Sequence, residues 1–301
     1  MDLRTLQCFL LLSEELHFGR AARRAGITQP ALSHQIRRLE DELGVVLFQR
    51  TSRRVSLTDA GTALITGARR VLTDAERARR HCHEAAAGGA GQLALASIGA
   101  ALNSIVPGLV RTLRRERPGI AIHLTQMDTP VALGALRDGR VDVAIVRSAP
   151  EVHGIEVRDL LAEPMVAALS DDHPLADREP VDVSDLRDDD FVLWPRSVSE
   201  SFHDQVIGVC QRAGFSPRVV MEGTDIETQL GLVSAGIGVL LMPAGFMALR
   251  RVGVVFARLA PPVPTSMLQL AWLDREPSAA ARAFIDLACR EGALEHEWFL
   301  T

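Results

Sequence analysis

The period of the hydrophobic pattern changes near residue 90, and this change restricts the fold more than any other feature of the chain. Before it, apolar residues recur with helical spacing. From Leu93 onward, short apolar runs typical of strands alternate with helical segments, which predicts an α/β fold with a mostly parallel sheet. The run GGAGQ at 88–92 separates the two parts and is typical of a hinge. A chain of 301 residues is also too long for one ordinary core.

Two helices, a tight turn and a third helix are predicted before residue 44. The turn is expected at Gly26, after a patch of alanines. Thr28 then suits the N-cap of the third helix, and Pro30 fits its first turn because the N–H that proline lacks would be unpaired there. The inward stripe of this helix is expected to be Leu32, Ile36, Leu39 and Leu43. A different face carries Gln29, Pro30, Ser33, His34 and Arg37.

The next segment predicts a two-stranded wing followed by a long helix. Residues 45–58 combine β-branched residues, an arginine cluster and a turn, and Thr58 is expected to cap a helix that runs to about residue 87. Apolar positions in this helix alternate steps of three and four, as in a coiled coil, and small alanines permit close approach of a partner. The positions are Leu64, Ala68, Val71, Ala75, Ala78, Cys82 and Ala85.

Charge is informative only when it is divided along the chain. Residues 1–90 contain 14 Arg and 10 acids, a net charge of +4, so the remainder carries −9 to reach the total of −5. The basic part is therefore the candidate for binding a polyanion. A helix, a glycine turn and a second helix presenting Gln, Ser, His and Arg is typical of a helix-turn-helix, whose second helix enters the DNA major groove. The alternative is a solvated helix face in a small bundle.

The later pattern predicts two α/β lobes around a cleft. Pro164 and the proline-rich run 260–264 lie where the chain would cross between the lobes and return. In the first lobe we expect strands at 93–97, 120–127 and 141–147, with helices at 103–116 and 131–137. In the second we expect strands at 165–169, 191–195, 218–222 and 236–243, with helices at 202–213 and 227–234.

Other classes of protein are less consistent with the sequence. It contains no P-loop, G-x-S-x-G, H-E-x-x-H or Rossmann fingerprint, which disfavours an enzyme. A solute-binding protein would need an export signal, whereas the first 16 residues carry acids. No apolar run approaches the roughly 20 residues that cross a bilayer, so a cytoplasmic location is expected.

The four cysteines do not predict a disulfide or a metal site. They are scattered, and the ligand-like residues of the triplet 81–83 would point in different directions on a helix. Cys210 and Cys289 lie among apolar residues, so buried thiols are favoured over redox sensing. Neither a metal nor another cofactor is expected.

Residues 18–61 resemble the DNA-binding region of LysR-type transcriptional regulators, with the elements AA, TQPALS, QI, LE, LG, LF-R and LT-AG in register. The similarity continues through DHPLA at 172–176 and LGLVSAGIGVLLMP at 230–243, and it is strongest to the branch that regulates aromatic-compound catabolism. The resemblance implies a winged helix-turn-helix at 1–57, a dimerisation helix at 58–87, a hinge at 88–92 and a two-lobed effector-binding domain like a periplasmic binding protein at 93–301. Lobe 1 would comprise about 93–161 and 266–301, and lobe 2 about 162–265.

The resemblance also implies partners and DNA-contacting residues. The partners would be double-stranded promoter DNA, a small-molecule effector, RNA polymerase and further copies of the chain in a homodimer or homotetramer. Residues expected to face the major groove are Gln29, Pro30, Ser33, His34 and Arg37. Arg50, Arg53 and Arg54 would lie on or near the wing and touch phosphate or the minor groove, although a soluble charged turn is the alternative.

The effector is expected in the cleft between the lobes. The lining would be Ala100, Asn103, Ser104, Thr129 and Arg147 from the first lobe, and Pro195, Arg196, Ser197, Phe202 and Thr224 from the second. Arg147 follows an apolar strand at the end where open α/β sheets bind ligands, which predicts an organic acid, with an ion pair to Asp128 or Asp225 as the alternative. Ala100 stands where benzoate- and muconate-responsive relatives carry serine, so either the ligand differs or Ser97 or Asn103 substitutes.

Overall fold

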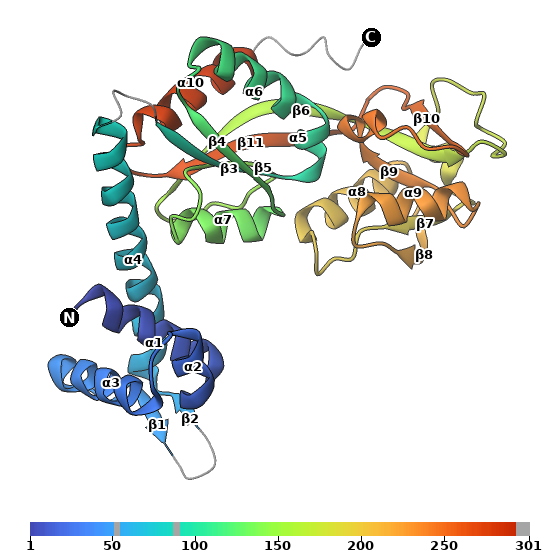
Figure 1. Cartoon of the computed structure of the whole chain (residues 1–301). Helices are drawn as coiled ribbons and strands as arrows, with labels where there is room; N and C mark the ends of the chain where they lie inside the picture. Colours follow the sequence, from blue (N-terminus) through green and yellow to red (C-terminus); the bar gives the residue numbers. More distant parts are fainter. Residues whose placement is uncertain (51–54, 87–90, 293–301) are drawn as a thin grey trace. The chain divides into compact units, whose positions relative to one another are not determined.

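A computed structural model describes residues 1–50, 55–86 and 91–292 (Figure 1). The chain forms two compact units, of which the first spans residues 1–89 and the second contains most of the remainder. The described helices include none that is long and apolar enough to cross a membrane.

The first unit is a winged helix-turn-helix followed by a long helix. Its elements are α1 (Leu3–Glu15), α2 (Phe18–Arg24), α3 (Gln29–Leu43), β1 (Phe48–Arg50), β2 (Val55–Leu57) and α4 (Asp59–Ala86). The start of α3 is as predicted, because the Thr28 side chain accepts a hydrogen bond from the N–H of Ala31 and Pro30 lies in the first turn. Gly44 ends the helix with a φ of 69°, a left-handed conformation that glycine adopts without strain.

The core of the first unit forms where α1, α2 and α3 meet. Leu32, Ile36 and Leu39 are fully buried there, together with Phe9 and Phe48. Leu43 was predicted to continue the inward stripe, but its side chain is 39% exposed, so that prediction is wrong. Leu43 is the last residue of α3, and its position at the helix end outweighs its position on the apolar face.

The apolar stripe of α4 divides between two environments. Ala68 is buried in the core of the first unit, and Leu64 packs partly against it. Val71 is 41% exposed, and Ala78 and Cys82 are exposed as well. The beginning of the stripe therefore packs within its own chain, and the exposed positions from Val71 onward are those that a partner helix can cover. The side chains of His81, His83 and Ala85 lie outside the described part of the chain.

The second unit is built on a seven-stranded sheet whose central order is β10-β6-β11-β5-β3-β4, with β9 also paired to β6. The strands are β3 (Gln92–Ser97), β4 (Ala121–Gln126), β5 (Val143–Arg147), β6 (Ile155–Ser170), β9 (Leu240–Pro243), β10 (Val254–Arg258) and β11 (Thr265–Leu273). Among the described strands of this sheet, β3 pairs in parallel with β4 and with β5. Strand β6 is antiparallel to β9, β10 and β11. The sheet is therefore mixed rather than mostly parallel. A separate parallel pair consists of β7 (Asp190–Leu193) and β8 (Arg218–Glu222).

Helices of the second unit follow the predicted order as far as residue 234, and the helix after residue 278 was not predicted. They are α5 (Gly99–Asn103), α6 (Ile105–Glu116), α7 (Thr129–Arg137), α8 (Glu200–Arg212), α9 (Ile226–Ser234) and α10 (Ala279–Gly292), with short 3-10 turns η1 (Val183–Leu186) and η2 (Ala244–Ala248). The helix expected at 103–116 is two helices, because Ser104 has non-helical φ and ψ of −119° and −94°. Helix α7 begins two residues earlier than predicted.

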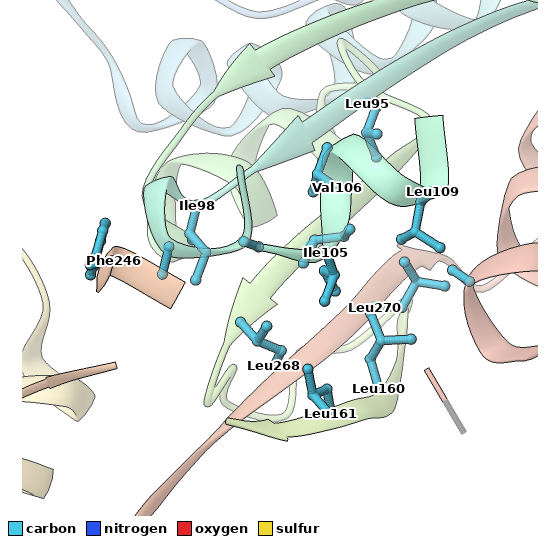
Figure 2. Packing of buried hydrophobic residues seen from close by; sticks show 14 of the residues in the cluster. Leu95, Ile98, Ile105, Val106, Leu109, Leu160, Leu161, Phe246, Leu268 and Leu270 are labelled. Atoms are coloured by element: carbon cyan, nitrogen blue, oxygen red, sulfur yellow. The ribbon is translucent and has the colours of Figure 1, made fainter. Parts of the chain in front are cut away.

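Strand β6 joins two hydrophobic cores. Its first part pairs with β11, and its second part pairs with β9 and β10. One core packs α5, α6 and α10 on the strands, and Figure 2 shows Ile98, Ile105 and Phe246 within it. The other contains Phe191, Phe202 and much of α8. Pro164 in β6 faces Thr265 of β11, so both predicted crossing points lie side by side.

Candidate nucleic-acid interface and ligand pocket

Helix α3 separates packing residues from polar residues on two faces. Gln29, Pro30, His34 and Arg37 are exposed and Ser33 is half-buried, whereas Leu32, Ile36 and Leu39 are inaccessible. Arg37 makes no hydrogen bond or ion pair with the part of the chain that the structure describes. Its guanidinium is therefore available to a partner, and it can donate two hydrogen bonds to a guanine edge or reach a phosphate.

Two arginines of α2 form ion pairs within the protein, unlike Arg37 of α3. Arg20 and Arg24 both pair with Glu15 of α1, at 2.9 and 2.8 Å. Hydrogen bonds from Arg24 and Arg20 hold the pKa of the Glu15 carboxyl below its ordinary value. These two arginines thus join α1 to α2, whereas Arg37 remains free on α3.

The wing is attached to α3 through Glu40. Its side-chain Oε1 accepts hydrogen bonds from the backbone N–H groups of Leu47 and Phe48, at 2.9 and 3.2 Å. Strands β1 and β2 are antiparallel, with Arg50 opposite Val55. Arg53, Arg54 and the side chain of Arg50 lie outside the described residues, so their predicted phosphate contacts stay a prediction.

A pocket in the second unit brings together residues from both sides of β6. It contains about 480 Å³ of space between atoms, part of it open to solvent. The lining consists of Ile98, Gly99, Ala100, Asp128, Thr129, Arg147, Trp194, Val198, Ser199, Phe202, Pro243 and Phe246.

Four of the ten predicted effector residues line this pocket: Ala100, Thr129, Arg147 and Phe202. Asn103 and Ser104 do not, because their side chains hydrogen-bond the carbonyls of Gly99 and Ala100 within the same turn. Nor does Ser97 replace the serine missing at position 100, since it is fully buried and bonds the carbonyl of Ile98.

The remaining predicted residues of the second lobe are outside the lining, namely Pro195, Arg196, Ser197 and Thr224. Arg196 donates two 2.9 Å hydrogen bonds to Asp204 and also pairs with Glu200 at 2.6 Å. The bonds from Arg196 lower the pKa of Asp204 to about 2. Arg196 is therefore held on the surface of α8.

Arg147 is the buried charged group of the pocket. It is 7% exposed, and its Nη2 donates to the carboxylate of Glu163 on β6, which is fully buried. Glu163 also accepts a 2.7 Å hydrogen bond from the N–H of Gly245. Arg147 therefore forms an ion pair, as the alternative prediction stated, but its partner is Glu163 and neither Asp128 nor Asp225. Asp225 instead caps α9 by accepting from Thr228.

One nitrogen of Arg147 remains without a partner. Nη1 is buried and has no hydrogen-bond acceptor among the described residues. The guanidinium carbon lies 5.9 Å from the centre of the Phe202 ring. Burying an unpaired N–H costs free energy, so this group favours an acceptor that enters the pocket.

Three aromatic rings form part of the pocket lining. Trp194 meets Phe202 edge to face, with ring centres 5.3 Å apart, and stacks on Phe246 at 6.0 Å. Of these three rings, only Phe202 was predicted as a site residue. Trp194 and Phe246 come from separate segments, after β7 and in η2, and no local pattern indicates that they meet.

Comparisons with known proteins agree with this architecture over nearly the whole chain. Residues 3–62 match the family described as "Bacterial regulatory helix-turn-helix protein, lysR family", and residues 86–293 match "LysR substrate binding domain". The chain is 34% identical to the HTH-type transcriptional regulator AlsR of Bacillus subtilis (strain 168), over 86% of each protein. It is 37% identical to ClcR of Pseudomonas putida, over 81% of this chain and 83% of ClcR.

A solved structure of full-length CbnR with its target DNA superposes with a TM-score of 0.79 at 29% identity, covering 97% of this chain and all of the other. The chain belongs to the LysR family. It is a DNA-binding transcriptional regulator with an effector-binding domain, and the class of enzymes considered above is set aside by this membership.

We expect Arg37→Ala to weaken binding to the operator by about 1–3 kcal/mol and to weaken binding to unrelated DNA less, if Arg37 reads a base. Fluorescence anisotropy at one fixed salt concentration measures both, with an operator that the wild type selects from random duplexes. Arg38→Ala is the matched control, because Arg38 is exposed and lies 3.9 Å from Asp2. An equal loss on both DNAs would mean that Arg37 contacts only phosphate.

We expect Cys210 to stay unlabelled by iodoacetamide in the folded protein while the half-buried Cys289 reacts. Cys210 is fully buried, and burial raises the pKa of its thiol to about 11. Raising the pH from about 8 to about 10 should not label it, since the thiol remains protonated below its pKa. Mass spectrometry before and after unfolding separates the two sites. Labelling of folded Cys210 as fast as Cys289 would reopen redox sensing.

Proposed function

We propose that this regulator senses a small aromatic or unsaturated carboxylate in the pocket around Arg147. The observation that carries the proposal is the buried Nη1 of Arg147, which lacks an acceptor among the described residues. A carboxylate oxygen supplies that acceptor in a strong, charge-assisted hydrogen bond. The rings of Trp194, Phe202 and Phe246 supply apolar surface to the lining.

Ligand binding can change the arrangement of the two sides of the pocket. Thr129 and Arg147 come from α7 and β5, whereas Trp194 and Ser199 come from the segment before α8 and Phe202 from α8 itself. Glu163 lies on β6, which runs between the two cores. A ligand that fits one arrangement better shifts the population toward it, and this shift is the proposed signal to the promoter.

The effector site is tested by screening small organic acids for thermal stabilisation, followed by calorimetry of each acid that stabilises the wild type. The test variant carries Arg147→Met together with Glu163→Met, so that no unpaired charge is left buried. We expect binding to weaken at least about tenfold. Arg196→Ala, outside the pocket, should bind normally. Equal affinity of the double variant and the wild type would refute a role for Arg147 in binding.

We further propose that the protein acts in the cytoplasm as a homodimer through α4, or a homotetramer, with RNA polymerase as a further partner at the promoter. The exposed Val71, Ala78 and Cys82 lie along α4 with the spacing of a coiled coil. Two copies of the chain would present two recognition helices, which predicts an inverted-repeat operator.

Val71→Asp should disrupt this pairing, because it places an unpaired charge in the proposed seam. Sedimentation measures the mass of wild type and variant at equal concentration. Val252→Asp is the matched control, since Val252 is 94% exposed in the second unit. An unchanged mass for Val71→Asp would remove this placement of the interface.

A further inference from the structure

The pocket around Arg147 also carries one exposed acidic side chain, Asp128, that pairs with no described residue. Arg147 and Glu163 neutralise each other. Asp128 lines the same pocket, immediately before α7, and its carboxylate forms no hydrogen bond or ion pair with any residue of the described ranges. An N–H donor without an acceptor and a carboxylate without a donor thus face one cavity.

We propose that the effector is a small zwitterion with an aromatic side chain, such as an aromatic amino acid, rather than a simple carboxylate. The ligand's carboxylate accepts from Arg147 Nη1, its ammonium group donates to Asp128, and its ring packs on Trp194 and Phe246. This inference rests on the proposed function and narrows the ligand class of that same site.

The charge balance distinguishes the two kinds of ligand. A simple carboxylate adds a second negative charge beside Asp128, and the two like charges repel, with water around the exposed Asp128 screening part of that repulsion. A zwitterion adds no net charge and satisfies both groups. The aromatic wall suits it as well, because ring faces attract an ammonium group that lies near them.

Asp128 has a second explanation, which the test must separate from the first. It stands at the N-terminal end of α7, where a negative side chain stabilises a helix through the helix dipole. Thr129, the first residue of α7, also bonds the backbone N–H of Arg147 at 3.1 Å, so a change in α7 can reach Arg147. A helix role alone would change stability without changing the preference between ligands.

The experiment uses matched probes that differ only by an ammonium group. Phenylacetate is compared with L-phenylglycine, and 3-phenylpropanoate with L-phenylalanine, by calorimetry on the full-length wild type and on Asp128→Asn. We expect the ammonium-bearing member of at least one pair to bind the wild type about tenfold or more tightly than its partner. In Asp128→Asn that ratio should fall close to one. Glu151→Gln, an exposed acid outside the pocket lining, should keep the wild-type ratio.

Three results would overturn the inference. If the simple acids bind the wild type as tightly as their zwitterionic partners, Asp128 does not select the ligand. A preference that persists in Asp128→Asn would leave Asp128 only the helix role. Absence of binding for all four probes at millimolar concentration would contradict the aromatic zwitterion. The proposed function would still stand if the screen finds an organic acid whose binding is weakened by the Arg147 and Glu163 double substitution.

Discussion

Replacing Arg147 with methionine alone should lower the free energy of unfolding by about 3–5 kcal/mol, because it leaves a buried carboxylate without its counter-charge. Glu163 is fully buried, and after the substitution its remaining hydrogen bond is the one from the N–H of Gly245. A carboxylate in such surroundings loses its hydration without a compensating cation. Urea unfolding at pH 7, followed by tryptophan fluorescence, measures the loss.

The double variant separates the charge effect from the loss of packing. Replacing Glu163 with methionine as well removes the uncompensated charge, and apolar residues in place of a buried ion pair are often neutral or stabilising. We therefore expect the double variant to recover most of the stability that the single variant loses. If the double variant has as low a free energy of unfolding as Arg147→Met, the loss of stability arises from altered packing around Phe202 and not from the broken ion pair.

Replacing Ile36 with alanine should destabilise the first unit by about 2–5 kcal/mol, because Ile36 is fully buried between the helices and its removal leaves a cavity. A unit of this size has little stability to spare, so DNA binding should be lost on moderate warming. Circular dichroism against temperature and anisotropy with labelled DNA follow the two losses together.

Two neighbouring substitutions test whether the loss comes from the core. Ile36→Val removes one methylene and should cost only about 0.5–1.5 kcal/mol. Arg37→Ala lies on the exposed face and should change DNA binding with little change in the melting temperature. A stable Ile36→Ala protein would mean that the buried stripe of α3 contributes less than its burial indicates.

Local rules determined the first unit. The stripe of Leu32, Ile36 and Leu39, the Thr28 cap and Pro30 in the first turn depend on residues a few positions apart, and all have the predicted structure. The family motifs from AA to LT-AG lie within the same unit and correctly indicate a DNA-binding regulator. The order of strands and helices from Leu93 to Pro243 follows for the same reason, since the hydrophobic period reports local secondary structure, whereas β10, β11 and α10 were not predicted.

Tertiary structure alone decided which distant segments meet. Strand β6 begins ten residues before the predicted run at 165–169, because charged residues such as Glu156 and Arg158 interrupt the apolar pattern while β11 still pairs with them. The exposed and buried parts of α4 differ because only its beginning reaches the core of its own unit.

The pocket shows the same limit most clearly. Arg147 could be identified as a site residue from its place at the end of a strand. Its pairing with Glu163, and the convergence of Asp128, Trp194 and Phe246 on the same cavity, depend on strand register and on packing between segments far apart in the chain. Hydrophobic periodicity carries no information about these contacts, because it specifies which face of an element is buried and leaves open which element covers it.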